Sequence, residues 1–328
     1  MVYLERIIEV IIQETSSFGS IITSEYFMSI LDMFKSEKKN ALCKKLLLSF
    51  ISSPSTTSDP VIIHTVFDLA RNLHDSIDAL TFSDERQQIS DLVCRFVEKI
   101  DFGRDLEQQL HVYVDCRAAF PNFDNVNEKL VNVTACLAMR AHALVKGKHT
   151  RKTASFVKAC LAYCHITIPS IEGFYRRMPL FLLCGRVALF NQCIAQADTF
   201  FTETINAIEK VPAQVVMQRS RRSTEPLLTE IVKNLVAALV IAPGHPQEGP
   251  FFLTKRLLNV LGEYSWQSGS KAKISLYLQI ARLLCAYGQK KLPYHVQAVE
   301  SNDTLYAGAS KYQNELKSMI KIVMGAIV

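Results

Sequence analysis

Apolar residues recur along most of this chain at the three- and four-residue spacing of an amphipathic helix. The clearest stripe lies within residues 83–100 and consists of Ile89, Leu92, Val93, Phe96, Val97 and Ile100. Ser83 is a suitable N-cap for this helix, and Gly103 follows its end. A second stripe begins at once, over 106–120, and stops at Pro121. Because the connection is short, the two predicted helices run antiparallel as a hairpin.

The same periodicity predicts helix pairs along the whole chain. They are 3–14 with 24–35, 38–51 with 60–79, 83–100 with 106–120, 126–146 with 152–167, 173–190 with 192–208, 224–241 with 251–264, and 271–287 with 303–324. Successive pairs begin roughly 35 to 51 residues apart, close to the ~40 to 47 residues of HEAT and armadillo repeats. We therefore expect an all-α fold, an α-solenoid of HEAT-like antiparallel helix hairpins.

The domain organisation follows from the same pattern. One hairpin cannot bury both of its faces, so neighbouring hairpins stack and share apolar surface. The turn-forming stretches at 52–60 and 242–250 fall between predicted helices and are interpreted as inter-helix loops. We expect residues 1–328 to form a single continuous α-solenoid segment of about seven helix pairs. Neither end has the polar outer face of a capping repeat, which favours a fragment or shortened form of a longer array.

Composition agrees with stacked helices. Hydrophobic residues make up 49% of the chain and charged residues 21%, and glycine and proline number only 12 and 11. The longest apolar run, 227–242, is interrupted by Glu230 and Lys233 and is shorter than the ~20 residues that span a bilayer. The start lacks the apolar core of a signal peptide, and nine scattered cysteines indicate reduced core thiols in a cytoplasmic protein.

The net charge of +6 comes from short basic groups near predicted helix ends, where solvated positive charge is common. One of these groups, Arg219 to Thr224, also carries hydroxyl side chains. Addition of phosphate to Ser220, Ser223 or Thr224 would invert the local charge, so this loop is a candidate phosphorylation site. The alternative is an unmodified solvated loop.

Known signatures of catalysis are missing from the sequence: it has no P-loop, dinucleotide fingerprint, nucleophile elbow or His-Glu-x-x-His motif. Cys160 and Cys164, with His165, could share a soft cation with His149 or His142, but buried core thiols explain the cysteines as well. His74-Asp75 resembles the centre of a metal-dependent phosphohydrolase motif, but no other His-Asp pairing supports it, and a capped or solvated helical histidine is the alternative. We therefore predict no enzyme activity, no catalytic residue, no cofactor and no metal site.

Large amphipathic side chains gather near the last predicted helix pairs. Tyr264, Trp266 and Tyr287 are candidate partner-binding residues, because tyrosine and tryptophan are favoured anchors in protein interfaces. Packing in the core is the alternative explanation for each of them.

Several phrases resemble one known family. They are Leu92-Val-Cys-Arg-Phe96, Asp105-Leu-Glu-Gln-Gln109, Arg117-Ala-Ala-Phe120 and the stretch from Leu130 to Ala141. These phrases are similar to the C-terminal solenoid of the vacuolar protein sorting 35 family. Three further phrases are most similar to its 35-like branch, the large subunit of the endosomal Retriever complex: Ala70-Arg-Asn-Leu-His-Asp-Ser76, Cys160-Leu-Ala-Tyr-Cys-His165 and Gly262-Glu-Tyr-Ser-Trp266.

The resemblance implies a non-enzymatic scaffold that sorts membrane-protein cargo from the endosome to the plasma membrane. It implies that the C-terminal hairpins bind the small vacuolar protein sorting 29 subunit, and that coiled-coil and COMM-domain proteins of the Commander assembly and sorting nexin adaptors are further partners. The family's N-terminal motif for the arrestin-like subunit does not occur here, so that subunit is not expected to bind. The protein is expected to be cytoplasmic and peripheral to the endosomal membrane.

Two other functions are weighed against this scaffold. A helical-repeat nucleic-acid-binding protein would need Lys or Arg at equivalent positions of successive repeats, and the sequence shows no such ladder. A hydrolase would have to use His74-Asp75 or the Cys160, Cys164 and His165 group. We therefore expect no nucleic acid partner and no chemistry.

Overall fold

The computed structural model describes residues 26–78, 80–217, 220–245, 247–306 and 308–327, together with residues 3, 6–8, 10, 19 and 22–24. The chain divides into two compact units, Met1–Thr134 and Ala135–Val328. The division falls inside one long helix, α8 (Asp124–Leu144). Each unit is described separately below.

The first unit consists of helices joined by short turns. They are α3 (Phe27–Asp32), α4 (Ser36–Ser52), α5 (Pro60–Asp75), α6 (Ser83–Glu98), α7 (Leu106–Ala119) and the first half of α8. Helix α4 packs against α3, α5 and α6. The first predicted helix, 3–14, lies largely outside the described residues.

Caps and aromatic packing explain the first unit. The side chain of Asp59 accepts a hydrogen bond from the Val61 amide at 2.9 Å, and Pro60 occupies the first turn of α5, where its missing N–H costs nothing. Phe96 is fully buried, and its ring lies 6.1 Å from that of Phe50. The apolar stripe read from the sequence of α6 is therefore its core face.

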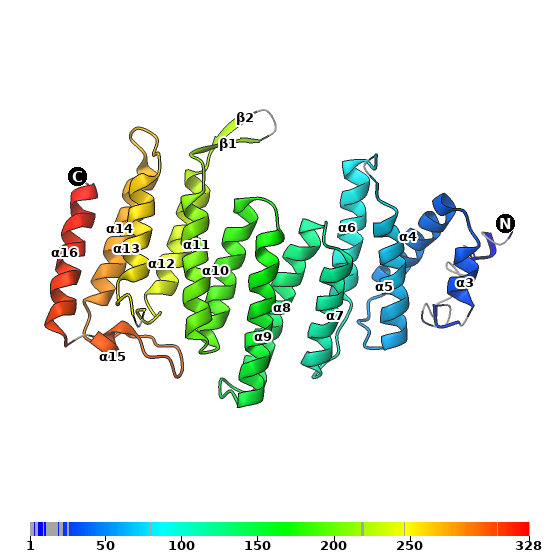
Figure 1. The fold of residues 1–328 in the computed structure, drawn as a ribbon, viewed down its shortest axis with the longest axis horizontal. Coiled ribbons are helices and arrows are strands. Elements are labelled where there is room, and N and C mark those ends of the chain that lie inside the picture. Colours follow the sequence, from blue (N-terminus) through cyan, green and yellow to red (C-terminus); the bar gives the residue numbers. More distant parts are fainter. Residues whose placement is uncertain are drawn as a thin grey trace. The chain divides into compact units, whose positions relative to one another are not determined.

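The second unit continues from the second half of α8. It contains α9 (Arg151–Thr167), a 3₁₀ turn η1 (Ile168–Ser170), α10 (Phe174–Phe190), α11 (Ile194–Glu209), strands β1 (Gln214–Met217) and β2 (Ser220–Ser223), α12 (Glu225–Leu239), α13 (Phe252–Glu263), α14 (Lys271–Tyr287), α15 (Asn302–Tyr306) and α16 (Ser310–Ile327). Figure 1 shows these elements from green to red.

The helices of the second unit pack in two rows. Helices α10, α12 and α14 follow one another in one row, α11 packs on α13 in the other, and α16 packs on α14. Helices α10 and α11 approach each other closely, since a Cβ atom added to Gly185 would lie only 2.6 Å from the Phe201 ring. This glycine allows the two helices to approach. The all-α solenoid of helix hairpins predicted from the sequence is confirmed.

Two elements differ from the prediction. The predicted helix 303–324 is divided into α15 and α16 near Gly308, a residue of low helix propensity. The expected loop before α12 contains an antiparallel β-ribbon, in which Val215 pairs with Arg222 and Val216 with Arg221. The β-branched valines favour the extended conformation of this ribbon.

The segment between α14 and α15 crosses other turns of the second unit. The Gln192 side-chain amide donates to the Gly147 carbonyl at 3.0 Å and also lies 3.3 Å from the Gln297 carbonyl. Gln192 adopts a positive φ of 62° in the turn between α10 and α11. This segment thereby contacts turns that lie more than a hundred residues earlier in the chain.

Candidate functional site

The β-ribbon and the loop between α13 and α14 lie at the same end of the second unit (Figure 1). Thr224, which follows β2, contacts Tyr264 at the end of α13. The Thr224 hydroxyl, at the start of α12, lies 2.5 Å from the Pro212 carbonyl and 2.8 Å from the Tyr264 hydroxyl. Because a threonine hydroxyl has one proton, it donates to Pro212 and accepts from Tyr264. Burial raises the pKa of Tyr264, so its hydroxyl remains a donor at neutral pH.

A buried carboxylate holds the α13–α14 loop. Glu225 accepts hydrogen bonds from the backbone amide of Gln267 at 2.8 Å and from the Ser270 hydroxyl at 2.7 Å. Ser270 also caps α14, because its side chain accepts from the Lys273 amide. One carboxylate therefore ties the start of α12 to the start of α14.

Trp266 completes this end of the unit. Its indole N–H donates to the Leu261 carbonyl at 2.9 Å, and its ring lies edge-to-face with that of Tyr264 at 4.7 Å. Both side chains are half-buried. The structure thus brings together Tyr264, Trp266 and Thr224, which the sequence offered as unrelated candidates.

Tyr287, the third candidate anchor, lies elsewhere. Its side chain is buried, its hydroxyl donates to the Leu239 carbonyl at 2.8 Å, and its ring lies 5.8 Å from that of Phe251. Burial raises the pKa of this phenol far above its ordinary value. Tyr287 therefore contributes to the packing beneath the surface.

The three candidate phosphorylation residues differ in access. Thr224 is 3% exposed and its hydroxyl makes two hydrogen bonds, whereas Ser223 is half-buried at the end of β2. The backbone of Ser220 lies in β2, and its side chain lies outside the described residues. Ser223 is the more accessible of the two hydroxyls whose surroundings are described.

The residues considered for metal or hydrolytic chemistry lie in packed surroundings. Cys160 and Cys164 are buried, and burial raises the pKa of the Cys160 thiol. The His165 ring lies edge-on to Phe200, and His74 bonds Asp75 at 3.0 Å while its ring packs on Phe120 and Phe123. Within the described ranges, no three His, Cys, Asp or Glu side chains group together as metal ligands would.

Exposed aliphatic side chains mark the last two long helices. Ile274 and Leu278 lie one turn apart on α14 and are 45% and 46% exposed. Ile322 and Met324 of α16 are exposed as well. The opposite faces of the two helices are buried, through residues such as Leu276 and Leu316. These helices therefore carry apolar groups on both their core and their solvent faces.

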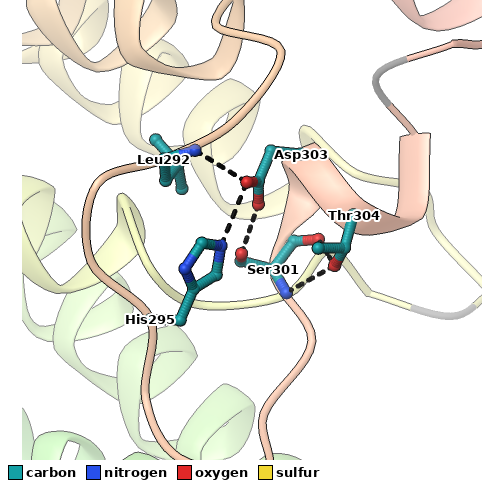
Figure 2. Close-up of polar contacts among 5 residues, drawn as sticks. All are labelled: Leu292, His295, Ser301, Asp303 and Thr304. Carbon is teal, nitrogen blue, oxygen red and sulfur yellow. Dashed lines mark hydrogen bonds and ion pairs between the residues drawn. The ribbon is translucent and has the colours of Figure 1, made fainter.

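A polar cluster below these helices was not predicted (Figure 2). Asp303 accepts hydrogen bonds from the Leu292 amide at 2.7 Å, from the His295 ring at 3.0 Å and from the Ser301 hydroxyl. Burial alone would raise the pKa of Asp303, but these three donors together hold it well below its usual range. The cluster fixes the segment between α14 and α15.

None of the helices in the described ranges is both long enough and apolar enough to cross a membrane. Paired helices, polar contacts that fix loops, and exposed apolar side chains on the last helices define a protein of the α-solenoid class.

The chain belongs to a particular scaffold family, described as the VPS35L C-terminal domain, which it matches over residues 2–328. It is 40% identical over 326 residues to "VPS35 endosomal protein sorting factor-like" of Dictyostelium discoideum, covering 98% of this chain and 33% of that protein. It is also 40% identical, over 327 residues, to "VPS35 endosomal protein-sorting factor-like" of Mus musculus and of Homo sapiens, covering 99% of this chain and 34% of each relative. The chain thus spans about a third of the length of these relatives.

Proposed function

We propose that this chain is the C-terminal scaffold portion of an endosomal protein-sorting factor of the Retriever type. The names of its relatives and the family match support endosomal sorting. In this proposal the chain binds the vacuolar protein sorting 29 subunit and helps return membrane-protein cargo from the endosome to the plasma membrane. It does so as a cytoplasmic protein without chemistry of its own.

The exposed aliphatic residues of α14 and α16 carry the proposal. Ile274 and Leu278 are nearly half exposed on one helix, and Ile322 and Met324 are more exposed still on the helix that packs against it. Leaving such side chains in water is unfavourable, by about 25 cal/mol for each Å² of apolar surface. A compact subunit with an apolar contact surface would cover Ile274 and Leu278, which lie on one side of α14.

The half-buried Tyr264 and Trp266 lie in the connection that leads from α13 to α14 and extend the proposed contact region. Both combine an apolar ring with a polar group that is already hydrogen-bonded. A partner that covers these rings would therefore leave no polar group of theirs buried without a hydrogen bond. Coiled-coil and COMM-domain proteins and sorting nexin adaptors are proposed as further partners, on other surfaces.

Isothermal titration of this chain with purified vacuolar protein sorting 29 tests the proposal, with Trp266 fluorescence as a second readout. We expect saturable binding, and about tenfold weaker binding for the double variant Ile274→Asp/Leu278→Asp, which corresponds to ~1.4 kcal/mol. Val114→Asp on α7, another exposed apolar position, is the matched control and should bind as the unmodified chain does. Equal affinity of the double variant and the control would contradict the proposed surface.

A further inference from the structure

The β-ribbon formed by β1 and β2 is not used by the function proposed above. It lies between α11 and α12 and extends beyond the ends of the neighbouring helices (Figure 1). The turn between α10 and α11, by contrast, needs only residues 191–193. Packing of the helices does not require an insertion of this length.

The base of the ribbon is fixed, although its strands are exposed. Val211 is buried, and the Thr224 amide donates to the Ala213 carbonyl at 3.2 Å. The Thr224 hydroxyl adds its contacts to Pro212 and Tyr264. The ribbon therefore rises from an ordered platform, so less conformational entropy is lost when a partner binds to it.

Both outer edges of the ribbon are open. Among the described residues, β1 pairs only with β2, so the outward-facing N–H and C=O groups of each strand have no strand partner. Open strand edges accept an extended segment of another chain, because its backbone can complete the ladder.

The side chains of the ribbon define the chemistry of that segment. Directly paired residues share a face, so Val216 and Arg221 lie on one face and Val215 and Arg222 on the other. Each face therefore presents one valine and one arginine. Val216, Arg221 and Arg222 are all exposed.

The charged side chains of the ribbon segment itself are all positive. Residues 210–224 include Lys210, Arg219, Arg221 and Arg222 and contain no Asp or Glu. No ion pair joins the Arg221 or Arg222 guanidinium to a residue that the structure describes. Glu225, the carboxylate that follows this segment, is buried and already accepts hydrogen bonds from Gln267 and Ser270.

We propose that the β2 edge binds an extended acidic segment of a partner protein, which adds to the ribbon as a third strand. A strand beside β2 has successive side chains next to Arg221 on one face and Arg222 on the other. Two consecutive Asp or Glu residues in the partner therefore meet both guanidinium groups. Its backbone completes the β2 ladder.

A peptide strand fits this surface better than a nucleic acid does. The open edge presents backbone donors and acceptors at strand spacing, which a peptide backbone matches residue by residue. Two arginines would neutralise only about two phosphates, whereas nucleic-acid-binding proteins commonly contact six to ten.

Fluorescence anisotropy with labelled peptides tests the proposal on the full chain. The probe is Thr-Val-Thr-Glu-Glu-Val-Thr-Val, compared with a peptide that has Lys-Lys in place of Glu-Glu. A third peptide has proline on both sides of the Glu pair and so lacks backbone donors there. We expect the acidic probe to bind about tenfold more tightly than either comparison peptide.

Charge reversal of the chain makes the test specific. Arg221→Glu/Arg222→Glu should weaken binding of the acidic probe about tenfold and strengthen binding of the Lys-Lys peptide. Lys290→Glu/Lys291→Glu makes the same charge change at exposed positions elsewhere in the second unit and should leave both affinities within about twofold. Arg221→Gln/Arg222→Gln replaces the first variant if that one does not fold, and should weaken binding of the acidic probe.

Three outcomes would overturn the proposal. In the first, the Arg221 and Arg222 variants bind the acidic probe as the unmodified chain does. In the second, the proline-flanked peptide binds as tightly as the probe, which would indicate attraction of charge without strand addition. In the third, a single-stranded RNA oligonucleotide binds more tightly than the probe and loses this binding in the same variants.

Discussion

The carboxylate of Glu225, at the start of α12, accepts a hydrogen bond of 2.7 Å from the hydroxyl of Ser270, the N-cap of α14. The same carboxylate accepts from the Gln267 amide. The start of α12 and the connection that precedes α14, 45 residues apart in the sequence, are thereby held together by one side chain.

Replacement of Glu225 should destabilise the second unit. We expect Glu225→Ala to lower its free energy of unfolding by about 2 kcal/mol, because the Gln267 and Ser270 donors lose their charged acceptor. Urea unfolding followed by circular dichroism measures this. Glu230→Ala, at an exposed position of the same helix, should cost less than about 0.5 kcal/mol. Equal effects of the two changes would contradict the role of Glu225.

The close approach of α10 and α11 predicts opposite effects at two helical glycines. Gly185→Ala puts a Cβ atom against the Phe201 ring and should destabilise the protein by about 1–3 kcal/mol through overpacking. Gly262→Ala on α13 meets nothing within 4 Å and should be neutral or stabilise by up to about 1 kcal/mol, since alanine favours the helix. Thermal melting of the two variants should give shifts of opposite sign, or one shift downward and none for the control.

The Asp303 cluster predicts a dependence of stability on pH. The pKa of Asp303 is lower in the folded protein than the value of about 3.9 in an unfolded chain. Its contribution is therefore complete above about pH 5 and is lost as the pH falls toward the folded pKa.

The matching variant is Asp303→Asn. It should be less stable than the unmodified chain at pH 7, and the difference in melting temperature should shrink steadily below about pH 5. Glu300→Gln, an exposed neighbour, should show no such difference at any pH. A difference for Asp303→Asn that grows on acidification would have the wrong sign and refute this account.

Substitution of Tyr287 tests whether this residue stabilises the fold or contacts a partner. Tyr287→Phe removes the hydrogen bond to the Leu239 carbonyl and leaves that buried acceptor unpaired, so it should cost about 1–2 kcal/mol of stability. Binding of vacuolar protein sorting 29 should be unchanged at temperatures where the variant is folded. Tyr294→Phe, with the parent ring 79% exposed, should alter neither property.

The difference in solvent exposure between Ser223 and Thr224 predicts which of the two hydroxyls is phosphorylated. An arginine-directed kinase should modify Ser223 in preference to Thr224, because the Thr224 hydroxyl is buried between Pro212 and Tyr264. Peptide mapping by mass spectrometry locates the phosphate. Phosphate on Ser223 should weaken binding of the acidic probe, since it places negative charge beside Arg222. Tighter binding after modification would contradict this.

The helices could be predicted because each carries a long periodic stripe. The prediction for α14, 271–287, coincides with the observed helix, and 83–100 exceeds α6 by two residues. Local sequence is sufficient there, because the buried face and the capping residues lie within one segment. The expectation that residues 1–328 form a single continuous solenoid segment depends on packing between segments and remains a prediction.

The ribbon and the candidate site could not be predicted in the same way. The strands are only four residues long, and the sequence between them contains no Asn-Gly or Asp-Gly pair that would indicate a hairpin turn. The contact of Thr224 with Tyr264 joins residues 40 positions apart, and no periodicity within one helix encodes it. The one available signal was the pair of β-branched residues, Val215 and Val216, beside the arginines.

The contact of Gln192 with both Gly147 and Gln297 changes how the second unit is expected to melt. In a linear array each repeat touches only its neighbours, so the terminal repeat can fray while the rest stays intact. Here the segment that follows α14 contacts the turn between α10 and α11, because the Gln192 side chain donates a hydrogen bond to the Gln297 carbonyl, 105 residues away in the sequence. Loosening of the last helices therefore also removes the contact of Gln297 with the turn before α11, which couples fraying at this end to the middle of the unit.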